Sequence, residues 1–413
     1  MTTPPDGRLD HPPALAAFPL ALGLRLLAGA DVRATPAQLA AFRRYAQLGD
    51  PPADRLVAAL GALPADRGRA MVERALADGV DAVPDAPPEL RELVDRVAAV
   101  PYWVDTDQLA LAARVTGRAG LWGMLVALPY LALMGGYLAS RPDKVLVATG
   151  DLDTAAPRRL AETAHWWVDV TSPGALDRHG PGFAGVLRVR LVHARVRAAM
   201  RARPDWDHER WDAPVNQAQL AGTLMLFSLA NLAGCQAIGL RFTARERAAV
   251  FHLWRYVGWL LGVTPDLLPA TEADTWRLLW LEAATEFRPD ADSRRLAGAL
   301  ADALGPLLVP GDGRLSGAAT RALNSYATSY SRLVLGRANA DALGLPASTP
   351  FRAAVLATAA ANRTLEYARA VVPGSTRLGE TLGHRGRVAL ARRMLRAQRA
   401  TPPAAGRRGR RGG

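Results

Sequence analysis

The sequence predicts an all-α protein, on three observations. Apolar residues recur at spacings of three and four along most of the chain, as on one face of a helix. Helix-start signals recur as well: Thr35 precedes Pro36 and Gln38, and Thr243 is followed three residues later by Glu246. Strand patterns are scarce, and residues 144–148 form the best short candidate. With 413 residues and 50% hydrophobic content, the chain can bury a large core.

Proline and glycine separate the expected helices. The capping box at Thr35 predicts a helix to about residue 48, which Gly49-Asp-Pro-Pro52 ends. Thr106 or Asp107 is expected to cap a helix that leads into the uncharged residues 119–139. The other expected helices lie at about residues 53–62, 66–78, 87–99, 152–168, 188–197, 214–238, 243–261, 270–287, 291–308, 316–336, 350–371 and 376–399.

The chain divides into three expected parts. Residues 1–34 are expected to be irregular, residues 35–400 to form one large helical domain, and residues 401–413 to form a disordered basic tail. The net charge is +13, and part of it comes from this tail. Because the remaining arginines are scattered rather than grouped with aromatic residues, no specific nucleic-acid partner is expected.

Cysteine content and N-terminal composition favour a cytoplasmic protein. The single cysteine, Cys235, excludes an intrachain disulfide. No export signal is recognised, since Asp6 and Asp10 precede the moderately apolar start of the chain. Residues 119–139 are long enough to cross a bilayer, but burial is favoured because no second comparable span is found. Peripheral membrane attachment through this segment or through basic residues 385–399 is the alternative.

The most informative stretch is the helical run Arg188-Val-Arg-Leu-Val-His193-Ala-Arg-Val-Arg197. Arg190, His193 and Arg197 share one helical stripe, beside an apolar stripe of Leu187, Leu191, Ala194 and Ala198. Arg188 and Arg195 point to the far side. A haem would supply both an iron and anionic propionates to such a stripe, so His193 is the candidate iron ligand, with Arg190 and Arg197 near the propionates. The alternative is an exposed basic helix with an ordinary histidine.

Other metal chemistry has less support in the sequence. His165, His193 and His252 are the histidines on helices with apolar neighbours. A di-iron bundle needs two Glu-x-x-His pairs, and Glu162-Thr-Ala-His165 is the one pair with that spacing. No zinc-binding pair is present. Cys235 could act as a haem thiolate, although a buried structural thiol is the simpler interpretation.

Several separated motifs resemble those of the rubber oxygenase (latex clearing protein) family and the related ER-bound oxygenases. The resemblance covers about residues 35–340 and implies an all-helical fold with a globin-like core that binds haem b. The motifs are Gly49-Asp-Pro-Pro-Ala-Asp54, the run from Arg188 to Arg197, Ala213-Pro-Val-Asn-Gln217, Phe227-Ser228 and His252-Leu-Trp-Arg-Tyr-Val-Gly258.

The resemblance assigns roles to individual residues. His193 matches the proximal iron ligand, and Arg190 and Arg197 match arginines beside the haem. Arg159 and Thr163 match a distal arginine and threonine; they are four residues apart, so they share a helix face. Arg321 is a further candidate match. Where closed-haem relatives carry a lysine just before the distal threonine, this chain has Glu162, which excludes lysine ligation there and makes Glu162 a candidate proton-transfer group.

The function expected from this resemblance is a haem b-dependent oxygenase. It would use O2 to oxidise or cleave a carbon–carbon double bond in an apolar, isoprenoid or lipid-like substrate. Residues 119–139 and 214–238 are expected to wall a hydrophobic channel. Two alternatives stay open: a non-catalytic helical protein that binds haem or lipid, and a di-iron oxygenase.

Overall fold

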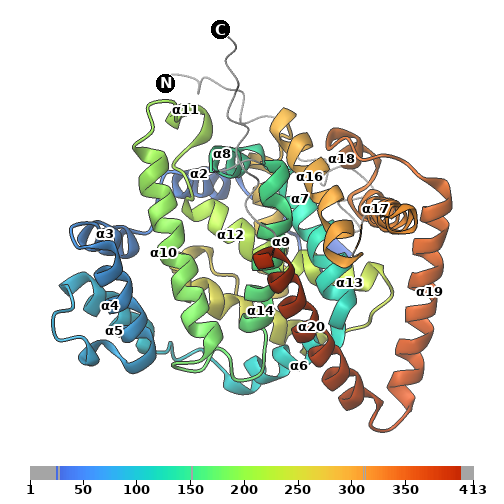
Figure 1. The fold of residues 1–413 in the computed structure, drawn as a ribbon, viewed down its shortest axis with the longest axis horizontal. Coiled ribbons are helices and arrows are strands. Elements are labelled where there is room, and N and C mark those ends of the chain that lie inside the picture. Colours follow the sequence, from blue (N-terminus) through green and yellow to red (C-terminus); the bar gives the residue numbers. More distant parts are fainter. Residues whose placement is uncertain (1–24, 27, 150–151, 310, 312, 401–413) are drawn as a thin grey trace.

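The structure is a computed structural model that describes residues 25–26, 28–149, 152–309, 311 and 313–400. The prediction of an all-α fold is confirmed: the described residues form helices and one isolated bridge between Ala139 and Phe287. In Figure 1, α3, α4 and α5 form a small group at one edge and α19 lies at the opposite edge. The long helix α10 stands between α3–α5 and the rest.

Helices of varied length follow one another through the N-terminal half of the chain. They are α2 (Pro36–Tyr45), α3 (Pro51–Gly61), α4 (Ala65–Asp78), the 3-10 helix η2 (Val80–Ala82), α5 (Pro88–Ala98), α6 (Thr106–Trp122), the π-helix η3 (Gly123–Leu133), α7 (Met134–Gly136), α8 (Ser140–Ala148), α9 (Leu152–Val170) and α10 (Pro181–Arg201).

The remaining helices complete the fold. They are α11 (His208–Trp211), α12 (Gln217–Met225), the π-helix η4 (Leu226–Ala230), α13 (Asn231–Ala237), α14 (Ala244–Leu260), the 3-10 helix η5 (Pro265–Leu267), α15 (Glu272–Thr285), α16 (Ala291–Leu308), α17 (Arg314–Leu335), α18 (Arg337–Ala342), α19 (Thr349–Val371) and α20 (Ser375–Ala400).

The helix caps agree with the sequence at two places and differ at a third. Thr35 and Thr243 each form a capping box, with Gln38 and Glu246 respectively, so both predicted starts are confirmed. Helix α6 is capped by the side chain of Asp105 and not by Thr106 or Asp107. The Asp105 carboxylate accepts hydrogen bonds from two of the free backbone N–H groups at the start of that helix.

Two local predictions are wrong. Residues 144–148 belong to helix α8 rather than to a strand. Their β-branched residues fit a strand, but α8 packs on α16 and Pro142 lies in its first turn, where proline is tolerated. Residues 25, 26 and 28 are helical, so the segment 1–34 is not irregular throughout; residues 1–24 and the predicted tail at 401–413 lie outside the described part.

Two described helical stretches, Thr106–Gly136 and Gln217–Ala237, are long and apolar enough to cross a membrane. The second stretch corrects the expectation that residues 119–139 stand alone. Both are mostly buried within the protein, as expected for residues 119–139, because their apolar side chains pack on other helices. Each stretch contains a π-helical segment, a distortion of the backbone that often occurs at functional sites.

A single large hydrophobic cluster runs from Phe42 on α2 to Met394 on α20. The C-terminal helix α20 crosses α6 closely: a Cβ at Gly383 would lie 2.2 Å from the carbonyl oxygen of Gly117. On the same helix, Arg387 is fully buried and donates to the backbone oxygen of Thr171 at 2.7 Å. Helix α20 is therefore part of the core, and the predicted domain limits of 35 and 400 stay a prediction.

Candidate functional site

A cavity of about 510 Å³ lies among α8, α9, α10, α12, η4 and α15. Its volume is within the roughly 300–1,000 Å³ of ligand pockets. Residues from both predicted channel walls line it, which confirms that expectation: Leu133, Gly136, Tyr137 and Ala139 from the first, and residues 219 and 222–227 from the second. Most of the lining is apolar, and Trp166, Phe227 and Trp254 are aromatic neighbours within it.

His193 enters this cavity from the middle of α10. Burial, together with the smaller effect of the nearby Arg197, lowers the pKa of its imidazole to about 4, so the ring is neutral near pH 7. Its Nδ1 atom is buried and has no hydrogen-bond partner among the described residues. A neutral imidazole is the form that binds a metal, so the structure supplies one nitrogen donor to the cavity.

Helix α9 supplies Arg159 and Thr163 to the same cavity, which confirms that they share one face. Arg159 donates a hydrogen bond to the Thr149 hydroxyl at 2.9 Å, and this contact fixes its guanidinium group at the cavity wall. Thr163 lies one turn further along. A cation and a hydroxyl thus reach the cavity from α9, while His193 reaches it from α10.

Glu162 also borders the cavity, but it is about half-exposed. Its carboxylate accepts a hydrogen bond from Arg158 at 2.8 Å, one turn earlier on the same helix. This ion pair and the contact with solvent place Glu162 at the rim of the cavity.

Asp143 is a buried acid in the cavity lining that the sequence did not indicate. It accepts a hydrogen bond from the Ser293 hydroxyl at 2.9 Å. Burial raises its pKa to about 8, against the smaller opposing effect of that hydrogen bond. The residue escaped notice because residues 144–148 were expected to form a strand, whereas a helix there turns Asp143 inward.

Arg190 and Arg197 are buried, as the shared stripe predicts, but neither lines the cavity. Arg190 donates to both oxygens of Asp50, at 2.7 and 2.9 Å, and Arg197 donates to Asp54 at 2.8 Å. The structure therefore pairs both guanidinium groups with carboxylates on α3 and its N-cap, and their place beside a haem propionate stays a prediction. In this arrangement they anchor α10 on both sides of His193.

The exposed and apolar faces of α10 agree in part with the prediction from helical spacing. Arg188 and Arg195 are exposed, and Arg188 forms an ion pair with Glu73. Leu187, Leu191 and Ala194 are buried in the core, but Ala198 is exposed and does not belong to the apolar stripe.

The remaining sequence candidates lie elsewhere. His165 is 3.5 Å from Asp169, and His252 accepts a hydrogen bond from the Asp105 amide at 2.9 Å; neither is in the cavity lining. Cys235 is buried beside a void of about 10 Å³, and burial raises the pKa of its thiol to about 12. Arg321 does not line the cavity either.

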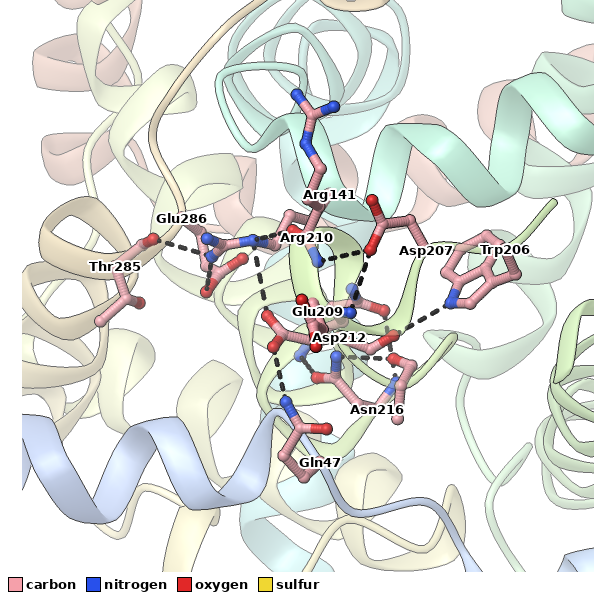
Figure 2. Close-up of polar contacts among 12 residues, drawn as sticks. Gln47, Arg141, Trp206, Asp207, Glu209, Arg210, Asp212, Asn216, Thr285 and Glu286 are labelled. Carbon is pink, nitrogen blue, oxygen red and sulfur yellow. Dashed lines mark hydrogen bonds and ion pairs between the residues drawn. The ribbon is translucent and has the colours of Figure 1, made fainter. Parts of the chain in front are cut away.

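A second buried acid, Glu282 on α15, lines the cavity beside Gly222. Behind it, one turn along the helix, Glu286 is bound by Arg141, which donates to Glu286 at 3.1 Å and to the Thr285 carbonyl at 3.1 Å. Figure 2 shows that Arg141 also faces Asp212, to which Gln47 donates at 2.6 Å. The Arg141 cation therefore neutralises Glu286, whereas Glu282 faces the cavity.

The donor set fits a prosthetic group better than an ion held by side chains alone. No group of three or more His, Cys, Asp or Glu residues capable of holding a metal ion is found among the described residues. A single neutral histidine in an apolar cavity suits an iron whose other ligands come from a macrocycle. His193 and the cavity thus fit a haem.

Sequence comparison decides the family. Residues 119–370 match the catalytic domain described as ER-bound oxygenase mpaB/B'/Rubber oxygenase. The chain belongs to this family. Within the rubber oxygenase family, it is 26% identical over 276 residues to the rubber oxygenase of Streptomyces sp. (strain K30), which covers 66% of this chain. The chain spans 64% of the length of that relative.

A solved structure has the same fold as this chain. It is the latex clearing protein LCP in the closed state, with a TM-score of 0.62 and 21% sequence identity. The likeness covers 88% of this chain and 93% of that one. The all-helical architecture therefore extends well beyond the matched catalytic domain.

Proposed function

We propose that the protein is a haem b-dependent oxygenase that uses O2 to oxidise or cleave a carbon–carbon double bond in an apolar, isoprenoid or lipid-like substrate. The observation that carries this proposal is the neutral His193 ring in an apolar cavity, facing the region that Arg159 and Thr163 border. Membership of the oxygenase family supports the same reaction class. A haem bound there would supply the O2 chemistry.

The residues of the chain would bind, orient and exclude water. His193 would ligate the iron. Arg190 and Arg197 would hold α10 against Asp50 and Asp54, so that the imidazole keeps its orientation. If a haem propionate displaced one of these carboxylates, the arginines would meet it, as the family resemblance implies.

On the other side, Arg159 and Thr163 would donate hydrogen bonds to oxygen or to the polar part of a substrate. Asp143 can hold a proton near neutral pH, since burial raises its pKa to about 8. Glu162, at the rim and paired with Arg158, could exchange protons with solvent. The aromatic and aliphatic lining would exclude water and accept an apolar chain.

Haem content of the purified protein tests the proposal directly. We expect a Soret band and a pyridine haemochrome of haem b from the wild type after haem-supplemented expression. His193→Ala should lose most of the haem, whereas Arg195→Ala, exposed two residues away on the same helix, should keep it. Equal haem content in wild type and His193→Ala would overturn the ligand assignment.

O2 uptake in the presence of an alkene separates the oxygenase from a non-catalytic haem or lipid carrier. Bound haem without O2 consumption or product, over a range of isoprenoid alkenes, would favour the carrier. A location in the cytoplasm, with peripheral membrane contact, stays a prediction that fractionation of cells can test.

A further inference from the structure

Two polar atoms on one wall of the cavity lack hydrogen-bond partners within the part of the chain that the structure describes. The Oε1 atom of Glu282 and the Nε2 atom of Gln219 are buried and have no hydrogen-bond partner among the described residues. Both residues line the cavity. Such atoms are costly when they stay unpaired, so each calls for a ligand or ordered water that completes its hydrogen bonds.

The two residues lie on neighbouring elements. Gln219 is three residues before Gly222 on α12, so the two share a helix face. Glu282, on α15, packs against Gly222 so closely that a Cβ there would lie 2.6 Å from Oε1. Glycine at this position therefore leaves room for the carboxyl group, and Glu282 and Gln219 form one polar spot on an otherwise largely apolar wall.

The charge state of Glu282 follows from its surroundings. Complete burial raises the pKa of its carboxyl well above the usual value, and the neighbouring Glu286 raises it further. Arg141 donates a hydrogen bond at 3.1 Å to Glu286, one turn further along α15. A neutral carboxyl group both donates and accepts hydrogen bonds, and the Gln219 amide nitrogen donates.

We propose that Glu282 and Gln219 bind a hydroxyl group, so that the substrate is an alkenol, an apolar unsaturated chain with one alcohol, rather than a pure hydrocarbon. This inference rests on the proposed function for its view of the cavity as the substrate site. A hydroxyl group can accept from Gln219 while it exchanges a hydrogen bond with Glu282, which satisfies both atoms. A hydrocarbon would displace water from this spot and replace none of its hydrogen bonds.

Ligand binding tests the proposal without turnover. The probes are geraniol and the hydrocarbon with the same carbon skeleton and no hydroxyl, titrated into the full-length protein by calorimetry. We expect the wild type to bind geraniol at least about tenfold more tightly, as one satisfied buried hydrogen bond implies. Equal affinity for the two probes would overturn the proposal, and so would tighter binding of the matching aldehyde than of the alcohol.

Three variants locate the preference. Glu282→Leu should abolish it, and Glu282→Gln, whose amide still donates and accepts, should retain it. Thr223→Val is the matched control: Thr223 lines the same cavity, but its hydroxyl already donates to the backbone carbonyl oxygen of Gln219 at 2.8 Å. If Glu282→Leu kept the full preference for the alcohol, the assignment would be contradicted. The assignment would also be contradicted if Thr223→Val were the one variant to lose that preference.

The outcome is separable from that of the haem experiment. A haem-free protein that still prefers the alcohol would support the hydroxyl site and count against the oxygenase. A haem-loaded protein that binds the two probes equally would support the haem site and count against the hydroxyl site.

Discussion

The buried ion pair between Arg190 and Asp50 should dominate the response of this protein to substitutions near His193. Both side chains are almost fully buried, and they share two hydrogen bonds of 2.7 and 2.9 Å. In Asp50→Ala, Arg190 would keep its hydrogen bond to the Leu260 carbonyl oxygen, at 3.1 Å, and would lose the carboxylate of Asp50 that balances its charge. Because an uncompensated buried charge costs about 3–5 kcal/mol, we expect a loss of that size in the free energy of unfolding.

Urea denaturation with linear extrapolation measures this loss. The control is Glu73→Ala, which breaks the exposed pair with Arg188 on the same helix and should cost less than about 1 kcal/mol. The double variant Asp50→Leu with Arg190→Met should recover much of the stability, since paired apolar side chains can replace a buried ion pair. Equal effects of Asp50→Ala and Glu73→Ala would refute the reasoning.

Two further predictions concern the cavity wall. Burial raises the pKa of Asp143 to about 8, so its charged form is disfavoured and its contribution to stability falls as pH rises from about 4 to about 8. Asp143→Asn should therefore gain more stability over the wild type at about pH 9 than at about pH 5; a pH-independent difference in urea denaturation would contradict this. Gly222→Ala should destabilise by up to about 1 kcal/mol, because its Cβ would lie 2.6 Å from Oε1 of Glu282 and would force that carboxyl group to shift. Gly298→Ala, which meets no atom within 4 Å in mid-helix, should instead stabilise by up to about 1 kcal/mol, and similar melting curves for both variants would refute the contact.

Local signals in the sequence predicted much of the fold. Capping boxes at Thr35 and Thr243 and the spacing of apolar residues depend on neighbours within a few positions, so they can be interpreted without the structure. The residues 144–148 were misassigned because their β-branched pattern suits either a strand or a helix, and packing on α16 decides between them.

In the candidate site, too, the sequence predicted some residues and missed others. The inward stripe of Arg190, His193 and Arg197 follows from helical spacing alone. The carboxylates that bind the two arginines lie some 140 residues earlier in the chain, so only the folded structure could identify them. Glu282 escaped notice for a similar reason: nothing in its own helix shows that Gly222 of α12 makes room for its carboxyl group.

The close crossing of α20 over α6 affects the folding of the chain during synthesis and the behaviour of truncated fragments. The family match ends at residue 370, yet Gly383 and Arg387 lie beyond it and pack into the core against Gly117 and Thr171. A fragment trimmed to the matched domain would expose an apolar face of α6. During synthesis at about 5–20 residues per second, that face waits on the order of ten seconds or more for its covering helix. The nascent protein is therefore exposed to aggregation until its C-terminal helix has emerged.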